Sequence, residues 1–351
     1  MSVLYVTDPD AYLRKNGEQI EIWRSGRVVN AVYGYQLKQV LVFGRAQLSP
    51  AVRSFLLDEG IDTVFLTMGG RLRGRLVAAE GRNIDLRRAQ FRHLEDGAFA
   101  IELARRIVSG KLLNCRTVLR RHHRVSPSDA VESAMHRIRY AAGQLDTAKT
   151  LDEVRGLEGA AAAAYFGCFG DLVKAKGFPF GGRSRRPPKD ALNALLSFGY
   201  MMLLGTITAA VQVVGLDVYL GCLHAPDNGK PSLALDLMEE FRPLLVDATV
   251  LRVVNRGQIV PDDFEYRTGM ELPDALGGDE DEAPSRESYP VLLKRESVRK
   301  WIAIYEATLR QRVVYGPLGV TLEWRDVCLE QARRLARHLK EEESYASFLV
   351  R

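Results

Sequence analysis

The sequence places one histidine just ahead of a helix that carries carboxylates. His224 precedes a turn through Asp227-Asn228-Gly229, and the next segment brings Asp236 and Glu239, three residues apart. On a helix, residues at this spacing are neighbours on one surface strip, and the turn can fold the imidazole back toward them. An imidazole and carboxylates at one point can hold a divalent metal ion. The same spacing also fits a solvated acidic helix after an ordinary loop.

A second carboxylate, Glu158, lies in the segment LEGAAAAAYF. A helix is predicted to begin at Thr150, because Glu153 follows it three residues later in a capping-box arrangement. Glu158 is then in the helix interior, with alanines one turn away and Tyr165 two turns away on the same face. This small-residue face allows a ligand or another backbone to approach the carboxylate. The alternative is a tightly packed helix with one glutamate at its edge.

A basic, proline-stiffened loop precedes an apolar helix in a third segment, RSRRPPKDALNALLSFGY. The free N–H groups at the start of that helix favour an anion, so a phosphate backbone is a natural ligand. The cations of the loop are Arg183, Arg185, Arg186 and Lys189. Asn193, Ser197 and Tyr200 form a polar stripe along the helix, which a helix–helix hydrogen-bond network would also explain.

Length and composition are those of a soluble globular protein with two domains. The chain has 351 residues, of which 46% are hydrophobic and 26% charged. The net charge of +5 permits a polyanionic partner without requiring one. Further basic clusters occur, among them Arg252 with Arg256, although each cluster alone is more often a solvated surface.

The cysteines and the N-terminal residues predict a cytoplasmic protein. The four cysteines are far apart and form no CxxC pair, which argues against a zinc knuckle and against a disulfide framework. The N-terminus lacks a basic region followed by a long apolar segment. The apolar run 191–215 is interrupted by polar residues, so it is predicted to be a buried core helix rather than a membrane span.

The element pattern predicts an α+β fold, with an N-terminal β-rich domain over residues 1–85 and a larger α-helical domain over residues 86–351. Short apolar strands alternate with hairpin turns at Asn16-Gly17 and Ser25-Gly26. One helix interrupts them, with Ser49 as N-cap and Pro50 at its first position. The later half has helical periodicity and ends in two amphipathic helices, over 298–312 and 321–340. The acidic stretch 277–285 is predicted to be a mobile loop.

Taken together, the three motifs and the β-rich start resemble the CRISPR-associated integrase family, the spacer-acquisition endonucleases of prokaryotic adaptive immunity. The order and spacing of three long motifs match, and the resemblance covers essentially the whole chain. It implies a homodimer built through the N-terminal domain and a Mn²⁺ or Mg²⁺ site in the helical domain.

Carried over by motif, the resemblance implies that Glu158, His224 and Glu239 are metal ligands and that Asp236 is an acidic residue required by the same site. The adjacent Glu240 leaves the register open, because a shift by one residue would exchange it for Glu239. Residues implied at lower rank as supporting or DNA-contacting groups are Tyr165, Asn193 and Ser232.

The implied reaction joins the 3′-hydroxyl ends of a double-stranded prespacer to the leader-end repeat of the CRISPR array by transesterification. The implied partner is a small ferredoxin-like CRISPR-associated adaptation protein, itself a dimer. Two alternatives remain open. One is a metal-dependent nuclease that hydrolyses branched or single-stranded DNA with the same residues, and the other is a non-catalytic DNA-binding scaffold.

Overall fold

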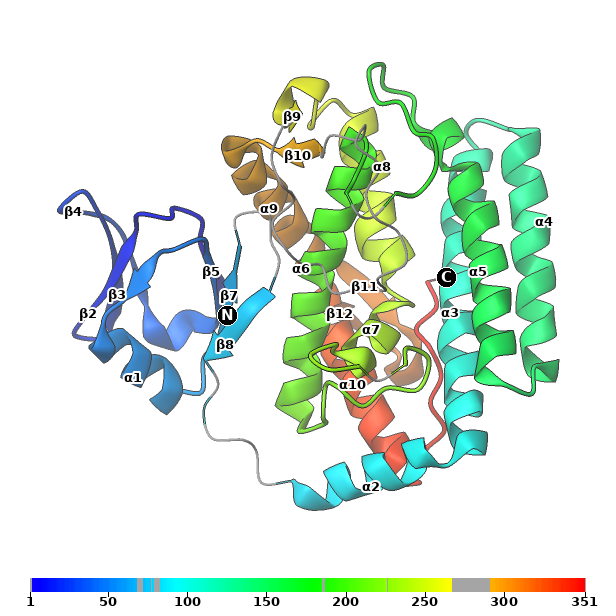
Figure 1. Cartoon of the computed structure of the whole chain (residues 1–351), viewed down its shortest axis with the longest axis horizontal. Helices are drawn as coiled ribbons and strands as arrows, with labels where there is room; N and C mark the ends of the chain where they lie inside the picture. The colour runs from blue at the N-terminus through cyan, green and yellow to red at the C-terminus, as the bar shows by residue number, and fades with distance from the viewer. Residues whose placement is uncertain are drawn as a thin grey trace. The chain divides into compact units, whose positions relative to one another are not determined.

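The computed structural model describes residues 2–67, 72–76, 78, 83–184, 187–225, 227–266 and 291–350. The chain forms two compact units, residues 1–82 and 83–351 (Figure 1). Sheets dominate the first unit and helices the second, which confirms the predicted α+β class. The acidic stretch 277–285, predicted to be a mobile loop, lies outside the described residues.

The first unit contains two four-stranded sheets. In one sheet, the parallel strands are β1 (Ser2–Val6), β5 (Leu37–Phe43) and β7 (Asp62–Leu66), and β8 (Leu72–Leu76) pairs antiparallel with β7. The order of the other sheet is β4 (Arg27–Tyr33), β3 (Gln19–Arg24), β2 (Tyr12–Asn16) and β6 (Gln47–Leu48). Helix α1 (Pro50–Asp58) lies between β6 and β7 in the chain.

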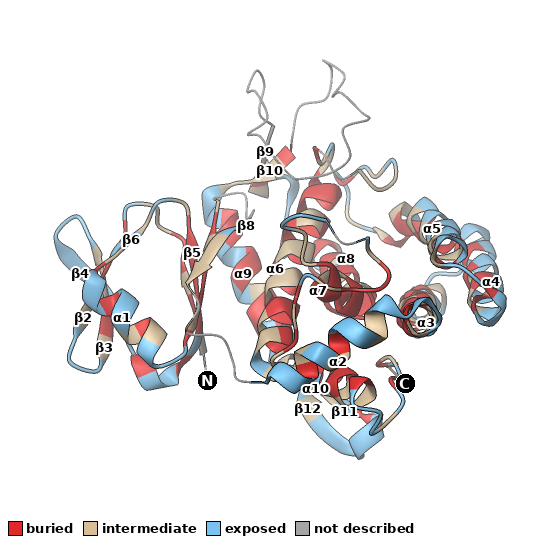
Figure 2. Cartoon of the chain, turned by 60° about the horizontal axis from the view of Figure 1, so that its bottom comes forward, coloured by how far each residue is buried: buried red, intermediate tan, exposed pale blue. Residues whose placement is uncertain are grey.

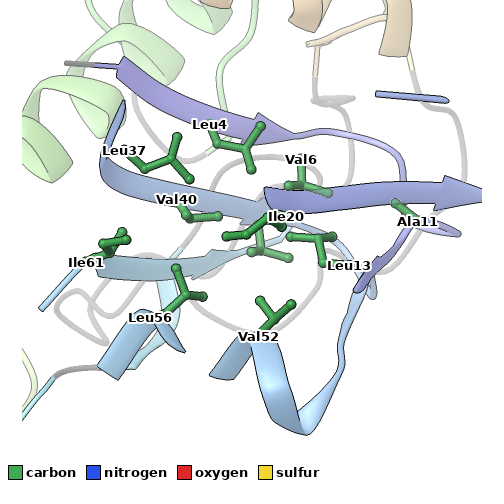
Figure 3. Packing of buried hydrophobic residues seen from close by; sticks show 11 residues of the cluster. Leu4, Val6, Ala11, Leu13, Ile20, Leu37, Val40, Val52, Leu56 and Ile61 are labelled. Atoms are coloured by element: carbon green, nitrogen blue, oxygen red, sulfur yellow. The ribbon is translucent and has the colours of Figure 1, made fainter. Parts of the chain in front are cut away.

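Local signals in the first unit are satisfied as predicted. The turns after β2 and β3 fall at Gly17 and at Ser25-Gly26, all with positive φ. The Ser49 hydroxyl accepts a hydrogen bond from the backbone N–H of Val52, capping α1. Residues from both sheets and from α1 pack into one apolar core, shown in Figure 3.

The second unit is built from nine described α-helices and two short hairpins. The helices are α2 (Ile84–Glu95), α3 (Gly97–His123), α4 (Asp129–Gln144), α5 (Leu151–Gly167), α6 (Ala191–Val214), α7 (Ser232–Met238), α8 (Ala248–Asn255), α9 (Arg295–Leu309) and α10 (Trp324–Leu339). The hairpins pair β9 (Phe264–Tyr266) with β10 (Val291–Leu293) and β11 (Arg312–Tyr315) with β12 (Val320–Glu323). The predicted terminal helices correspond to α9 and α10, but residue 312 and residues 321–323, predicted as helical, lie in β11 and β12 between them.

Helices α3, α4 and α5 lie side by side, and α6 packs against α7 and α10 (Figure 1). Figure 2 shows α7 almost wholly buried, whereas α4 exposes one face. Helix α6 is long and apolar enough to cross a membrane, but 56% of its apolar window is buried inside the unit. Asp190 caps its first turn through the Asn193 N–H, and Gly215 ends it at φ 92°. It is a core helix, as its interrupted apolar pattern predicts.

The last residues of the chain, 340–350, form a C-terminal segment that packs on α3. The Asn114 side-chain amide donates to the carbonyl oxygens of Phe348 at 2.8 Å and Glu240 at 2.9 Å. The Glu240 carboxyl group accepts from the Phe348 N–H at 2.7 Å, the Tyr345 hydroxyl at 3.1 Å and the Gln331 amide at 2.9 Å. Burial raises the pKa of Glu240 to about 7 even though these donors lower it.

We expect Glu240→Ala to lower the free energy of unfolding by about 2–4 kcal/mol, because three buried donors lose their acceptor. Chemical denaturation measures this loss, and limited proteolysis measures release of the C-terminal segment. Glu342→Ala is the matched control, since Glu342 lies exposed in the same segment. Equal stability of the two variants would show that Glu240 does not hold the segment.

Candidate metal centre

Three segments bring the predicted ligands together around one lysine. Lys111 of α3 places its Nζ in contact with Glu158 Oε1 of α5 and 2.6 Å from Glu239 Oε2, at the end of α7. Two oxygens that contact one nitrogen lie within about 6 Å of each other. The His224 Nε2 lies 3.8 Å from Glu239 Oε1. The structure therefore brings Glu158 and Glu239 together at Lys111 and places His224 beside Glu239.

Helix α5 begins as its sequence predicts and is tied to the histidine loop. The Thr150 hydroxyl accepts from the Glu153 N–H at 3.2 Å, which caps the helix. One turn before Glu158, the Arg155 Nε donates to the Leu223 carbonyl oxygen at 2.8 Å. This bond fixes the loop of His224 relative to the helix that carries Glu158.

Asp236 is the anchor of the histidine loop. It is wholly buried, and its carboxylate accepts from the backbone N–H groups of Cys222 at 2.6 Å, Leu223 at 2.9 Å and His224 at 2.9 Å. Its Oδ1 also lies 2.7 Å from His224 Nδ1. Because this carboxylate oxygen can only accept a hydrogen bond, the Nδ1 of His224 must carry a proton. In the neutral ring the free lone pair is then on Nε2, which faces Glu239.

The loop approaches Asp236 so closely that only glycine fits at position 221. A Cβ on Gly221 would lie 2.5 Å from Asp236 Oδ2 and 2.7 Å from the Ser232 carbonyl carbon. The solvated acidic helix that the spacing also allowed is wrong, because Asp236 is 0% and Glu239 3% exposed. Asp236 acts on the site through His224 rather than by facing Lys111.

The two consecutive glutamates point to different surroundings. Glu239 faces Lys111, and its Oε1 lies 3.2 Å from Arg242 Nε. Glu240 faces the C-terminal segment through Tyr345 and Phe348. The register that the sequence left open therefore places Glu239 beside Glu158, with Glu240 in a structural role.

Two cations that the sequence analysis did not select, Arg242 and Lys111, keep Glu239 ionised. Burial alone would raise the pKa of Glu239, but Arg242, Lys111 and His224 hold it well below its usual range. Burial alone would lower the pKa of Lys111, but Glu239 and Glu158 raise it. Lys111 stands at no recognisable spacing from the ligand motifs, whereas Arg242 follows Glu239 by three residues, a spacing that makes them neighbours on one helix face.

The donor set fits a hard divalent cation in its chemistry. Two carboxylates and one imidazole nitrogen suit Mn²⁺ and are compatible with Mg²⁺. Glu239 Oε2 is buried and makes no hydrogen bond of good geometry with the described residues, even with Lys111 Nζ 2.6 Å away. As the side chains stand, no three His, Cys, Asp or Glu residues of the described chain are arranged to hold a metal together. The cation between Glu158 and Glu239 is the Lys111 ammonium.

A small cavity of about 20 Å³ lies beside Lys111, lined in part by Tyr165, Arg183, Tyr200 and Asp247. The Tyr200 hydroxyl donates to Asp247 Oδ1 at 2.5 Å. Burial and the Asp247 carboxylate raise the pKa of both tyrosines well above the ordinary value. Both tyrosines are thus held in the phenol form, which is a poor nucleophile.

Asn193 and Ser232, predicted to support the site or contact DNA, are buried and bonded within the chain. The Asn193 amide donates to the Gly182 carbonyl oxygen at 2.9 Å and accepts from Arg183 Nη1 at 2.8 Å. The Ser232 hydroxyl donates to the Ala225 carbonyl oxygen at 3.2 Å. The polar stripe of α6 is therefore an internal hydrogen-bond network.

The predicted DNA-binding cations divide into bonded and exposed groups. Arg183 donates to Ser197 Oγ at 3.0 Å, and Arg252 donates to Thr308 Oγ1 at 2.7 Å. Lys189 and Arg256 are exposed. Arg185 and Arg186 lie outside the described residues.

Comparison with known sequences identifies the family. Residues 4–274 match the family model described as CRISPR associated protein Cas1. The chain is 38% identical over 356 residues to CRISPR-associated endonuclease Cas1 2 of Rhodospirillum rubrum, covering 97% of this chain and 95% of that protein. With CRISPR-associated endonuclease Cas1 3 of Thermus thermophilus it shares 33% identity over 354 residues, covering 100% and 98%. A Cas4/Cas1 fusion of Geobacter sulfurreducens is 36% identical over 99% of this chain, which spans 60% of that longer protein.

Solved structures share the fold of the whole chain. A Cas1 protein from Thermotoga maritima matches with a TM-score of 0.79 and 25% identity, covering 99% of this chain and 100% of that one. A casposase bound to integration product gives 0.81 at 23% identity, covering 99% and 93%, and a Cas6-RT-Cas1–Cas2 complex gives 0.80 at 22%, covering 99% and 36%. At those identities the last two support the fold alone. The chain belongs to the Cas1 family of CRISPR-associated DNA endonucleases and integrases.

Proposed function

We propose that this protein is a divalent-metal-dependent DNA integrase and endonuclease of CRISPR adaptation. In the proposed reaction, a prespacer 3′-hydroxyl attacks a phosphodiester at the leader-end repeat, and the new ester bond forms as the old one breaks. The observation that supports it most directly is the convergence of Glu158, His224 and Glu239 from three segments in a chain of the Cas1 family.

Glu158, Glu239 and the Nε2 of His224 would hold Mn²⁺ or Mg²⁺. When bound, such an ion supplies an activated attacking oxygen and offsets the charge that develops on the phosphate. The residues of the chain provide the positions. Asp236 fixes the ring of His224, and Arg242 keeps Glu239 ionised.

The attacking group would come from the DNA rather than from a side chain. The two tyrosines beside the centre, Tyr165 and Tyr200, are held in the phenol form by burial and by Asp247. A direct transesterification needs no covalent protein intermediate. Hydrolysis by water would use the same residues and differs only in the attacking oxygen, so the products separate the two reactions.

We also propose that the protein is a homodimer built through residues 1–85. Strand β4 forms an edge of its sheet, and its Val28, Val29 and Tyr33 are 46%, 58% and 43% exposed. An exposed apolar edge strand is a ready template for pairing with another chain. Two such dimers bridged by a Cas2-type, ferredoxin-like protein dimer would hold two active sites at a fixed separation. Buried, unpaired cysteines fit the proposed cytoplasmic location.

We expect Glu158→Gln and His224→Ala to lower strand transfer by at least about 100-fold, because each removes a donor to the proposed metal ion. The assay follows joining of prespacer 3′-ends to a repeat-containing duplex in the presence of the purified Cas2-type partner, with Mn²⁺, Mg²⁺ or chelator. Measured with chelator, DNA affinity should stay near wild type, because no metal ion contributes to it in either protein.

Glu153→Gln is the matched control, since it lies exposed on the same helix and glutamine also serves in a capping box. Full joining by Glu158→Gln would contradict the proposed centre. Shortened fragments without joined products, from wild-type protein, would favour the hydrolytic nuclease instead.

Asp236→Asn is expected to weaken Mn²⁺ binding by about 10- to 100-fold, as loss of a carboxylate behind a ligand histidine typically does. The amide cannot accept from all three backbone N–H groups and from His224 Nδ1 together. Isothermal titration with Mn²⁺ measures the change. Asp227→Asn, in the exposed part of the same loop, should bind Mn²⁺ like wild type. Wild-type Mn²⁺ affinity in Asp236→Asn would mean that His224 needs no such support.

A further inference from the structure

Lys111 fills the position between the two glutamates of the proposed metal centre. Its Nζ contacts Glu158 Oε1 and lies 2.6 Å from Glu239 Oε2, and its side chain is 11% exposed. Arg242 adds a second cation, 3.2 Å from the other oxygen of Glu239. The two carboxylates, Glu158 and Glu239, are therefore in direct contact with two cations, Lys111 and Arg242.

A divalent ion and the lysine compete for the same pair of carboxylates, because Lys111 contacts one oxygen of each. An ion held by Glu158 and Glu239 would lie about 2.0–2.6 Å from one oxygen of each. An ammonium in contact with both oxygens takes up that space, and its like charge repels the ion at short range. Lys111 must therefore leave its present position before both glutamates can bind one ion.

The surroundings of Lys111 allow this movement. Ala161 and Ala162 of α5 line the small cavity beside it, so the neighbouring helix presents methyl groups rather than long side chains. The lysine stem is unbranched and flexible, and its ammonium can donate in three directions. The same cavity is lined by Arg183, Arg242 and the Asp247 carboxylate, so it presents charges of both signs to a displaced ammonium.

We propose, on the basis of the metal centre proposed above, that Lys111 is a resident counter-cation that competes with the metal ion and couples metal binding to DNA binding. Once the ion has replaced Lys111 between the glutamates, the ion, Lys111 and Arg242 together carry four positive charges. Glu158 and Glu239 offset two of these, which leaves an excess of two positive charges. A DNA phosphate at the centre offsets this excess, and the displaced ammonium can donate to it. Metal and DNA then strengthen each other's binding by the same factor.

The test is a Mn²⁺ titration of the full chain by calorimetry, with and without a short DNA duplex bearing free 3′-hydroxyls. Without DNA, Lys111→Met should bind Mn²⁺ more tightly than wild type, by on the order of ten-fold or more, because the competing charge is gone. DNA should raise the Mn²⁺ affinity of wild type, and that gain should be smaller in Lys111→Met.

Lys111→Met leaves two carboxylates without their lysine partner, and this variant could therefore fail to fold. A second uncharged variant keeps the test informative in that case. Lys111→Gln keeps amide donors for a carboxylate and should change Mn²⁺ binding in the same direction. Lys149→Met is the charge-matched control, because Lys149 is exposed. This substitution also removes one positive charge, but away from the proposed metal centre. It should titrate like wild type.

Two outcomes would overturn the inference in distinguishable ways. If wild type binds Mn²⁺ and both Lys111 variants bind it equally or more weakly, Lys111 is no competitor, while the metal centre stands. If wild type binds no Mn²⁺ with or without DNA, or if Glu158→Gln leaves Mn²⁺ binding unchanged, the metal centre itself is wrong and the role of Lys111 falls with it.

Discussion

Glu158 and Glu239 share one site because Lys111 lies between them. Two carboxylates within about 6 Å of each other, one of them almost wholly buried, would repel, and one would take up a proton if no cation separated them. The lysine comes from α3, whereas the glutamates come from α5 and the end of α7. The ion pairs therefore hold three helices at the separation that the centre requires.

Side chains next to each other in the chain at Glu239 point to different places, some to the proposed metal centre and others to the core. Glu239 faces Lys111, while Glu240 accepts two hydrogen bonds from the C-terminal segment and one from Gln331 of α10. A π-helical turn, Arg242–Asp247, follows directly and brings Arg242 to Glu239 and Asp247 to Tyr200. Such turns are rare and often mark functional sites. Packing of the last residues of the chain and the geometry of the centre thus depend on one short stretch of backbone.

The sequence predicts the parts of the molecule that local chemistry determines. Caps, hairpin turns and the α+β order follow from residue types a few positions apart, as Ser49 and Thr150 illustrate. The parallel pairing of β1, β5 and β7 does not follow, because alternation of apolar residues marks a strand without naming its partner. Likewise, two adjacent glutamates look alike in sequence, and Lys111 is 47 residues from Glu158 with no spacing rule to join them. Only the tertiary fold shows which strands pair, which glutamate faces the centre and which lysine lies between the carboxylates.

Charge in the sequence indicates where cations gather but not which way they point. Arg183 and Arg252 were both selected as phosphate contacts, yet each guanidinium donates to a side-chain hydroxyl within the chain. The planar fork that suits phosphate suits internal acceptors equally well. Lys189 and Arg256 are exposed, so in the proposed function they would be available to phosphate groups. In the proposed function, such phosphate contacts would position a duplex without reading its bases, so sequence selection would depend on DNA shape or on partner proteins.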